Sequence, residues 1–122
     1  EKIEKISEFI PKQKLEQGTL GSKVLVLGWG STYGSIRMAV TQLLDDGHSV
    51  AQMHVKYLNP FPSNLEEMLK SFDTIIMPEI NDKQFYHVIR SKFMIDAIPL
   101  SKIKGLPFTS AEIYEFVKPY CS

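Results

Sequence analysis

The sequence contains a single cysteine, Cys121, close to its C-terminal end. One cysteine cannot form a disulfide within the chain, and by itself it cannot hold a zinc ion or an iron–sulfur cluster. The three histidines, His48, His54 and His87, include no i, i+4 pair of the kind that binds a metal on a helix. The composition therefore predicts no metal site in this chain, and it is consistent with a reducing, cytoplasmic location.

An excess of charge of one sign is also missing, because 14 basic residues balance 14 acidic ones. A neutral chain without a basic patch does not favour nucleic acid as a partner. The apolar runs are far shorter than the roughly 20 residues that cross a membrane, and no signal-peptide pattern is present. The 122 residues suit one domain. Because the chain begins at Glu1 without a methionine, we expect a piece of a longer chain or a processed form.

Residues 23–34 organise the chain, since an apolar run meets there a turn rich in glycine and hydroxyl groups. Residues 24–27, Val-Leu-Val-Leu, predict a strand that is buried on both faces. Beyond the turn Gly28-Trp29-Gly30, apolar residues at helical spacing predict a helix over about residues 33–46, which Gly47 ends in a left-handed conformation. Strand, glycine turn and helix form the opening unit of an α/β domain.

Strands and helices alternate along the rest of the chain. Strands are predicted over residues 50–57, 74–77 and 95–100, and the polar alternation of the first places it nearer the sheet margin than residues 24–27. This alternation predicts a mostly parallel sheet with helices on both faces. Residues 23–122 form the α/β domain. Residues 1–22 form a linker or short helix, with a possible edge strand at 12–17, where lysines suit an exposed edge.

Local signals mark the ends of these elements. Capping boxes, in which two side chains bond the first free amides of a helix, predict helix starts at Ser63–Glu66, Asn81–Gln84 and Thr109–Glu112. Val88 belongs to the apolar stripe of the middle one of these helices. Proline restricts the backbone and lacks an N–H, so Pro78 is expected to end a strand and Pro119 a helix.

Three distinctive loops, at residues 28–34, 58–62 and 78–82, follow successive strands and should meet at the carboxyl edge of the sheet. Trp29 and Phe61, expected on exposed loops, are either loop-packing residues or interface anchors. Glu79 is either a functional polar contact or a carboxylate bonded to loop amides. We predict that this edge is a partner-docking rim formed by Gly28, Trp29, Gly30, Ser31, Thr32, Asn59, Phe61, Glu79 and Asn81.

The glycine loop itself admits three interpretations. Gly28, Gly30 and Gly34 are spaced one residue more widely than in the dinucleotide fingerprint, and the strand-end acid that binds a ribose is missing. The hydroxyl groups of residues 31–35 are more similar to the phosphate loop of flavodoxins, where Trp29 or Tyr57 could stack on a flavin. The third interpretation is a tight turn whose glycines permit close packing. We predict no catalytic, cofactor-binding or metal-binding residue in this chain.

Four motifs taken together resemble one family: VLVLGWGSTYG at residues 24–34, LNPFP at 58–62, PEINDKQ at 78–84 and GLPF at 105–108. They are similar to the C-terminal domain of the α subunit of 2-oxoacid:ferredoxin oxidoreductases, above all to the 2-oxoglutarate branch. The resemblance covers residues 23–117, with small departures at Ile80 and Lys83. It implies a transketolase C-terminal-like fold, a three-layer α/β/α sandwich. Its mostly parallel five-stranded sheet would have residues 12–17 as one antiparallel edge strand.

Enzymes of that family decarboxylate a 2-oxoacid on thiamine diphosphate, pass electrons through iron–sulfur clusters to ferredoxin and release an acyl-coenzyme A. The resemblance implies that thiamine diphosphate, magnesium and the cluster bind elsewhere in the complex. It implies that this chain, inactive alone, supports the catalytic core and contacts the rest of the α subunit and the β subunit, meeting ferredoxin only through the complex. The alternative is a small flavodoxin-like FMN-binding electron carrier, although flavodoxins are usually strongly acidic and this chain is neutral.

Overall fold

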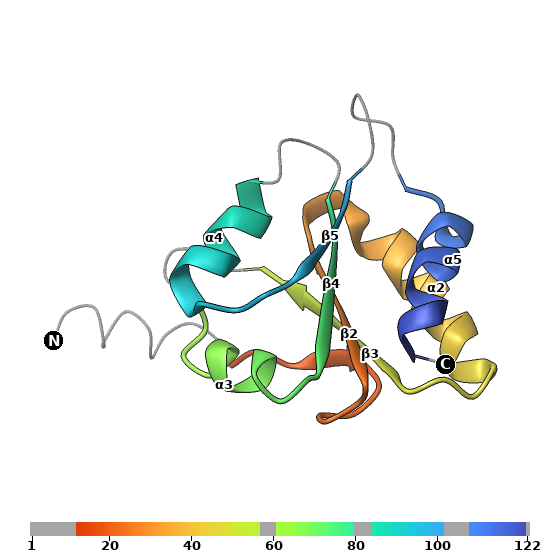
Figure 1. Cartoon of the computed structure of the whole chain (residues 1–122), viewed down its shortest axis with the longest axis horizontal. Coiled ribbons are helices and arrows are strands. Elements are labelled where there is room, and N and C mark those ends of the chain that lie inside the picture. Colours follow the sequence, from red (N-terminus) through yellow and green to blue (C-terminus); the bar gives the residue numbers. More distant parts are fainter. Residues whose placement is uncertain (1–11, 57–60, 80–83, 102–107, 122) are drawn as a thin grey trace, which may run out of the picture.

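The computed structural model describes residues 12–56, 61–79, 84–101 and 108–121, with the backbone alone at residues 79, 84 and 101. After the first strand, strands and helices alternate, as the sequence predicts (Figure 1). In chain order the elements are β1 Leu15–Gln17, β2 Val24–Trp29, the 3₁₀ turn η1 Gly30–Thr32, α2 Tyr33–Asp45, β3 Val50–Val55, α3 Leu65–Leu69, β4 Thr74–Glu79, α4 Gln84–Phe93, β5 Ile98–Ser101 and α5 Ser110–Cys121. The helix suggested within residues 1–11 lies outside the described residues.

The strands form one sheet in the order β1-β3-β2-β4-β5. Four of them run parallel, whereas β1 pairs antiparallel with β3 at one edge. The predicted mixed sheet with an antiparallel edge strand is therefore confirmed, although β1 is only three residues long. β2 lies at the centre and β3 one place from the edge, which agrees with the uniformly apolar run of the first and the partly polar pattern of the second.

Helices cover both faces of the sheet, which gives the predicted three-layer sandwich (Figure 1). α3 and α4 cover one face, and α2 and α5 cover the other. Each face buries its own hydrophobic cluster. We call them the aromatic side, which includes Phe61, Phe72, Phe85, Tyr86 and Phe93, and the aliphatic side, which includes Ile36, Ala39, Val40, Leu43, Ile113 and Val117.

Two of the predicted helix signals are confirmed. Gly47 follows the end of α2 with φ of +88°, a conformation that glycine adopts without steric cost. At the start of α5, the N–H of Glu112 donates to Thr109 Oγ1 at 3.1 Å, and the N–H of Thr109 donates to Glu112 Oε1 at 2.8 Å. This reciprocal pair is the predicted capping box. The pattern at 81–84 begins outside the described residues.

The predicted capping box at residues 63–66 is wrong. No side chain caps α3, which begins at Leu65. Ser63 Oγ instead accepts a hydrogen bond from Lys12 Nζ at 2.8 Å. Asn64 accepts from the N–H of Gln13 at 2.7 Å and donates to its C=O at 3.0 Å. The polar residues before α3 therefore hold the segment that leads into β1, a distant contact that a local pattern does not reveal.

Both prolines that were expected to end an element lie inside it. Pro78 is part of β4, where it lies beyond the last paired residues of β2 and β4, Val26 and Ile76. A missing N–H is tolerated there because the ladder with β2 has already ended. Pro119 lies in the last turn of α5, which continues to Cys121.

One boundary and one burial assignment also differ from the prediction. β5 begins at Ile98, three residues later than expected, and follows Met94, whose φ of +56° interrupts an extended backbone. In α4, Val88 was expected to be buried but is 39% exposed, and Tyr86 is buried in its place.

Among the described residues, no helix has the length and apolar character needed to cross a membrane.

Candidate functional site at the carboxyl end of the sheet

The sheet forks at the carboxyl end of its central strand. β2 stays paired with β3 as far as Trp29 and Val55, but its pairing with β4 ends at Val26 and Ile76. α2, which follows β2, covers one face of the sheet, and α4, which follows β4, covers the other (Figure 1). Such a switch point, where connections leave in opposite directions, is where α/β sheets bind ligands and partners. The fork is therefore the candidate functional site.

The glycine turn at the fork has a packing role. A Cβ atom at Gly28 would lie 2.5 Å from Ile36 Cδ1 and 3.2 Å from Thr32 Oγ1, so α2 can approach the sheet only because no side chain is present. Gly30 has φ of +71°, which L side chains rarely adopt. Gly28 is required by close packing and Gly30 by its backbone conformation, which agrees with the interpretation of this loop as a tight turn.

Two hydroxyl groups that suggested a phosphate loop are used inside the protein. Thr32 is buried, and its Oγ1 donates to the C=O of Trp29 at 3.2 Å. Ser35 Oγ donates to the C=O of Phe108 at 2.5 Å, which ties α2 to the segment before α5. Ser31 is exposed. A flavodoxin-like loop aims such hydroxyl groups at an anion, and the positions of Thr32 and Ser35 do not match that arrangement.

Trp29 ends β2 and is half-exposed at the fork, with 40% of its surface accessible. Its ring stacks on Phe85 of α4, with the centroids 5.6 Å apart and the planes inclined by 20°. Phe85 is itself buried. Trp29 thus extends the aromatic side to the protein surface, and an indole held by a buried ring is a typical interface anchor.

Phe61 is a core residue, and the expectation that it is exposed is wrong. It is 9% exposed, and its ring lies 5.3 Å from that of Phe93 in α4. Burying an aromatic ring removes a large apolar area from water, so Phe61 packs into the aromatic side although it lies outside a helix or strand. The sequence could not show this, because an aromatic in a proline-rich loop has no periodicity that indicates burial.

The predicted docking rim is therefore only partly exposed. Its exposed members, which we call the fork rim, are Trp29, Gly30 and Ser31. Its buried members are Gly28, Thr32 and Phe61. Glu79 ends β4, with only its backbone described, and Asn59 and Asn81 lie outside the described residues.

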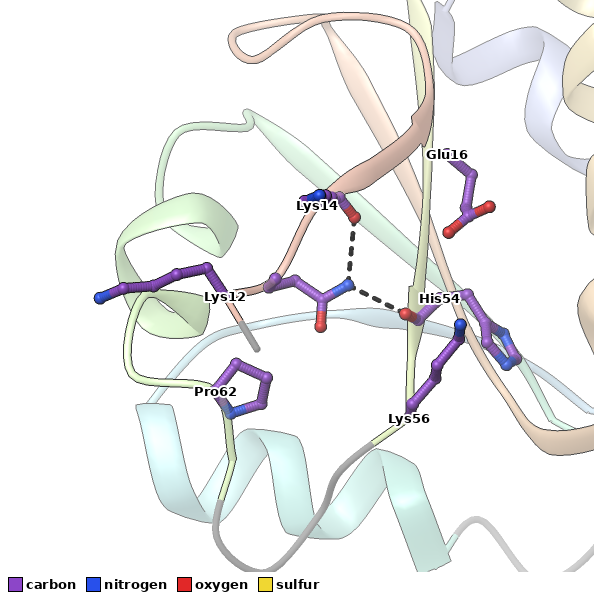
Figure 2. A pocket seen from close by; sticks show the side chains of 7 residues that line it. Lys12, Lys14, Glu16, His54, Lys56 and Pro62 are labelled. Atoms are coloured by element: carbon purple, nitrogen blue, oxygen red, sulfur yellow. Dashed lines mark hydrogen bonds between the residues drawn. The ribbon is translucent and has the colours of Figure 1, made fainter. Parts of the chain in front are cut away.

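A pocket beside the fork was not predicted from the sequence (Figure 2). It has a volume of about 240 Å³, lies between β1 and the end of β3, and is lined by Lys12, Gln13, Lys14, Glu16, His54, Lys56 and Pro62. The side-chain amide of Gln13 donates to the C=O of Lys14 at 3.1 Å and to that of His54 at 2.9 Å, the two bonds dashed in Figure 2. The available signal was the pair of lysines at 12 and 14, which were expected only to protect an exposed sheet edge.

His54 lies between this pocket and α2. Its ring meets the ring of Tyr33 edge-on, with the centroids 5.0 Å apart, and Tyr33 OH donates to Glu16 Oε1 at 2.9 Å. The buried His54 Nδ1 has no hydrogen-bond partner among the described residues. Burial lowers the pKa of His54 from its ordinary value, an effect that Glu16 opposes and Lys56 reinforces. The imidazole is therefore neutral at pH 7.

Cys121 serves packing. It is buried at the end of α5 within the aliphatic side, and burial raises the pKa of its thiol. The thiol is consequently protonated at neutral pH. Within the described ranges, no three His, Cys, Asp or Glu side chains are gathered so that they could hold a metal ion.

Most of the chain matches a known family. Residues 22–113 match the family described as pyruvate:ferredoxin oxidoreductase core domain II. The chain belongs to this family. The matched residues of this core domain II include β2, the fork rim and most of both hydrophobic clusters.

The curated relatives of this core domain II are much longer proteins. The chain is 37% identical over 109 residues to the 2-oxoglutarate oxidoreductase subunit KorA of Mycobacterium tuberculosis. This alignment covers 89% of the chain and 17% of the relative. It is 33% identical over 122 residues to subunit alpha of 2-oxoacid:ferredoxin oxidoreductase 2 of Aeropyrum pernix, which covers 96% of the chain and 19% of the relative. The chain thus spans less than a fifth of these two proteins.

Two solved structures share the fold of this core domain II. The 2-oxoglutarate:ferredoxin oxidoreductase from Magnetococcus marinus, with 2-oxoglutarate, coenzyme A and succinyl-CoA bound, matches with a TM-score of 0.86 and 31% identity over 96% of this chain and 21% of that chain. The alpha chain of a probable 2-oxoacid ferredoxin oxidoreductase from Thermoplasma acidophilum matches with a TM-score of 0.60 and 27% identity. This match covers 88% of this chain and 95% of that chain. The resemblance drawn from four sequence motifs is confirmed.

Proposed function

We propose that this core domain II is part of the α subunit of a 2-oxoglutarate-type 2-oxoacid:ferredoxin oxidoreductase. The observation that carries the proposal is the match, with a TM-score of 0.86, to an enzyme of that description with 2-oxoglutarate and coenzyme A bound. The relative from Mycobacterium tuberculosis is also a 2-oxoglutarate oxidoreductase subunit. In this proposal the cytoplasmic complex oxidises a 2-oxoacid to an acyl-coenzyme A and reduces ferredoxin.

Within that complex, the chain has a supporting and docking role. The fork rim suits docking because Trp29 is both exposed and fixed in place by its stack on Phe85, so little conformational freedom is lost on binding. The hydroxyl of Thr32 stabilises the turn behind it, and that of Ser35 holds α2 to the segment before α5. In this proposal the fork rim contacts the rest of the α subunit and the β subunit. Thiamine diphosphate, magnesium and the iron–sulfur cluster bind to other parts of the complex.

Assembly of the α and β subunits tests the docking role. Trp29→Ala should leave the subunit folded but weaken assembly, since truncating an aromatic anchor costs about 2 kcal/mol or more of binding, roughly a thirtyfold change in Kd. Analytical ultracentrifugation measures the Kd. Tyr120→Ala is the matched control, because Tyr120 in α5 is 37% exposed and should leave assembly unchanged. Normal assembly of the Trp29→Ala complex would refute the docking role.

Activity assays test the rest of the proposal. The assembled complex should reduce its electron acceptor faster with 2-oxoglutarate than with pyruvate when coenzyme A and thiamine diphosphate are supplied. The 122-residue chain alone should show no turnover in the same assay. Turnover by the chain alone would contradict the supporting role, and a preference for pyruvate would contradict the assigned substrate.

A further inference from the structure

The pocket between β1 and β3 carries an excess of positive charge. Its described lining contains three lysines, Lys12, Lys14 and Lys56, and one acidic residue, Glu16. With His54 neutral, three ammonium groups and one carboxylate give the lining a net charge of +2. The whole chain is neutral, with 14 residues of each sign, so the pocket differs from the surface as a whole.

The described residues leave this charge uncompensated. Lys12 Nζ donates to Ser63 Oγ, a neutral hydroxyl that satisfies a hydrogen bond without cancelling the charge. The ammonium groups of Lys14 and Lys56 form neither an ion pair nor a hydrogen bond within the described part of the chain. Glu16 is already engaged, since its Oε1 accepts from Tyr33 OH on the side of α2.

The arrangement is also held in place. The two hydrogen bonds from Gln13 to the C=O groups of Lys14 and His54 fix the start of β1 against the end of β3 (Figure 2). Asn64 bonds the backbone of Gln13 from the other side, at 2.7 and 3.0 Å. The backbones that carry Lys14 and Lys56 are therefore positioned before any ligand arrives, which lowers the entropic cost of binding.

We propose that this pocket binds the phosphate group of a small molecule. Lysine ammonium groups are strong, rotatable donors that suit phosphate oxygens. The volume of about 240 Å³ is smaller than pockets that enclose a whole drug-sized ligand, about 300–1,000 Å³. It suits one phosphate or diphosphate group, either free or as part of a larger ligand that extends outside. The proposal is independent of the fork rim and of the proposed function.

Isothermal titration of the 122-residue chain with inorganic pyrophosphate at low ionic strength tests this site. Saturable binding to one site is expected. Lys14→Gln and Lys56→Gln should each weaken it about tenfold, the size of effect expected for one hydrogen bond to a charged group. The matched control is Lys92→Gln on α4, which removes the same charge at a residue that is not part of the lining and should leave the Kd unchanged. Circular dichroism checks that each variant is folded.

Coenzyme A, which also carries phosphate groups, serves as a second probe. Tighter binding of coenzyme A than of pyrophosphate would indicate that the phosphate belongs to a nucleotide-like ligand, and equal or weaker binding would indicate a free diphosphate. Either result supports a phosphate site if Lys14→Gln and Lys56→Gln weaken the binding of the probe. The proposal fails if no saturable binding occurs up to about 1 mM of either probe. It also fails if folded Lys14→Gln and Lys56→Gln proteins bind like the original chain, or if Lys92→Gln weakens binding as much as they do.

Discussion

The two sides of the sheet reach close packing by different means. On the aromatic side, α3 and α4 are five and ten residues long, and large rings fill the space between them and the sheet. On the aliphatic side, α2 and α5 are thirteen and twelve residues long and use small and branched side chains. Where the helices are short, large side chains must fill more of the space above the sheet. Where the helices are long, small side chains suffice, provided that the helix axes lie close to the sheet.

This difference predicts opposite sensitivities. The aromatic side should lose most stability when a side chain is shortened, because large rings fill its core. The aliphatic side should suffer most from an added atom, because α2 already lies at the closest approach that Gly28 permits. The predictions below test this contrast, starting with the largest effect.

The first prediction concerns Phe61 on the aromatic side. Phe61→Ala should lower the free energy of unfolding by about 3–5 kcal/mol, because it removes a buried ring and leaves a cavity beside Phe93. Urea unfolding followed by circular dichroism measures the change. Trp29→Ala, which truncates a half-exposed ring in the same cluster region, should cost clearly less. If Trp29→Ala destabilises more than Phe61→Ala, the assignment of the two aromatics to anchor and core is reversed.

The second prediction adds one methyl group to the aliphatic side. Gly28→Ala should destabilise by about 1–3 kcal/mol, because the new Cβ would lie 2.5 Å from Ile36 Cδ1. Ile36→Val should recover part of that loss in the double variant, since it removes the clashing atom. Gly34→Ala is the matched control: nothing lies within 4 Å of its Cβ position, and alanine favours the helix. Equal destabilisation by both alanines would show that contact with Ile36 is not the cause.

The third prediction compares two similar sequence patterns at helix starts. Thr109→Ala should cost about 1 kcal/mol, because it removes the side chain that caps α5 on the aliphatic side. Ser63→Ala should change stability by less than about 0.5 kcal/mol, because Ser63 caps no helix on the aromatic side and bonds only an exposed lysine among the described residues. Thermal or urea unfolding separates the two. A larger loss of stability for Ser63→Ala than for Thr109→Ala would indicate that Ser63 caps α3.

The smallest expected effect is the pH dependence contributed by His54. Its pKa is lowered from the ordinary 6.5 on folding, chiefly by burial. The unfolded chain therefore binds more protons than the folded one just below pH 6.5, and the free energy of unfolding should fall as the pH drops through this range and stay level above it. Unfolding curves at pH 7.5 and 5.5 measure the change, and His54→Gln should reduce it. An unchanged pH dependence in His54→Gln would assign the effect to other groups.

Much of the fold could be predicted because its signals are local. Residues 24–27 are apolar without interruption, and they form the first four residues of the central strand. Gly47 and the Thr109–Glu112 pair end and start helices as their chemistry requires. The antiparallel direction of β1 was different, since only the family resemblance indicated it. A three-residue strand carries too short a pattern to reveal its direction.

The candidate site was less predictable, because burial and pockets depend on residues that are distant in sequence. Phe61 and Trp29 looked equivalent as loop aromatics, and each ring contacts a phenylalanine of α4. Their exposed fractions, 9% and 40%, distinguish the core ring from the exposed one. Ser63 has the sequence of a cap, but its hydroxyl bonds Lys12, 51 residues away. The pocket between β1 and β3 is lined by residues at β1, at the end of β3 and at Pro62, so no single stretch of sequence contains it.

Pro99 lies within β5, the strand at the margin of the sheet opposite β1. Proline has no N–H, so this margin offers one donor fewer to an extended strand arriving from another molecule. The margin at β1 is short and irregular in register, which gives a similar protection. Both margins thus discourage the edge-to-edge growth that leads to aggregation. An extended strand from another molecule is therefore disfavoured as a partner of this sheet.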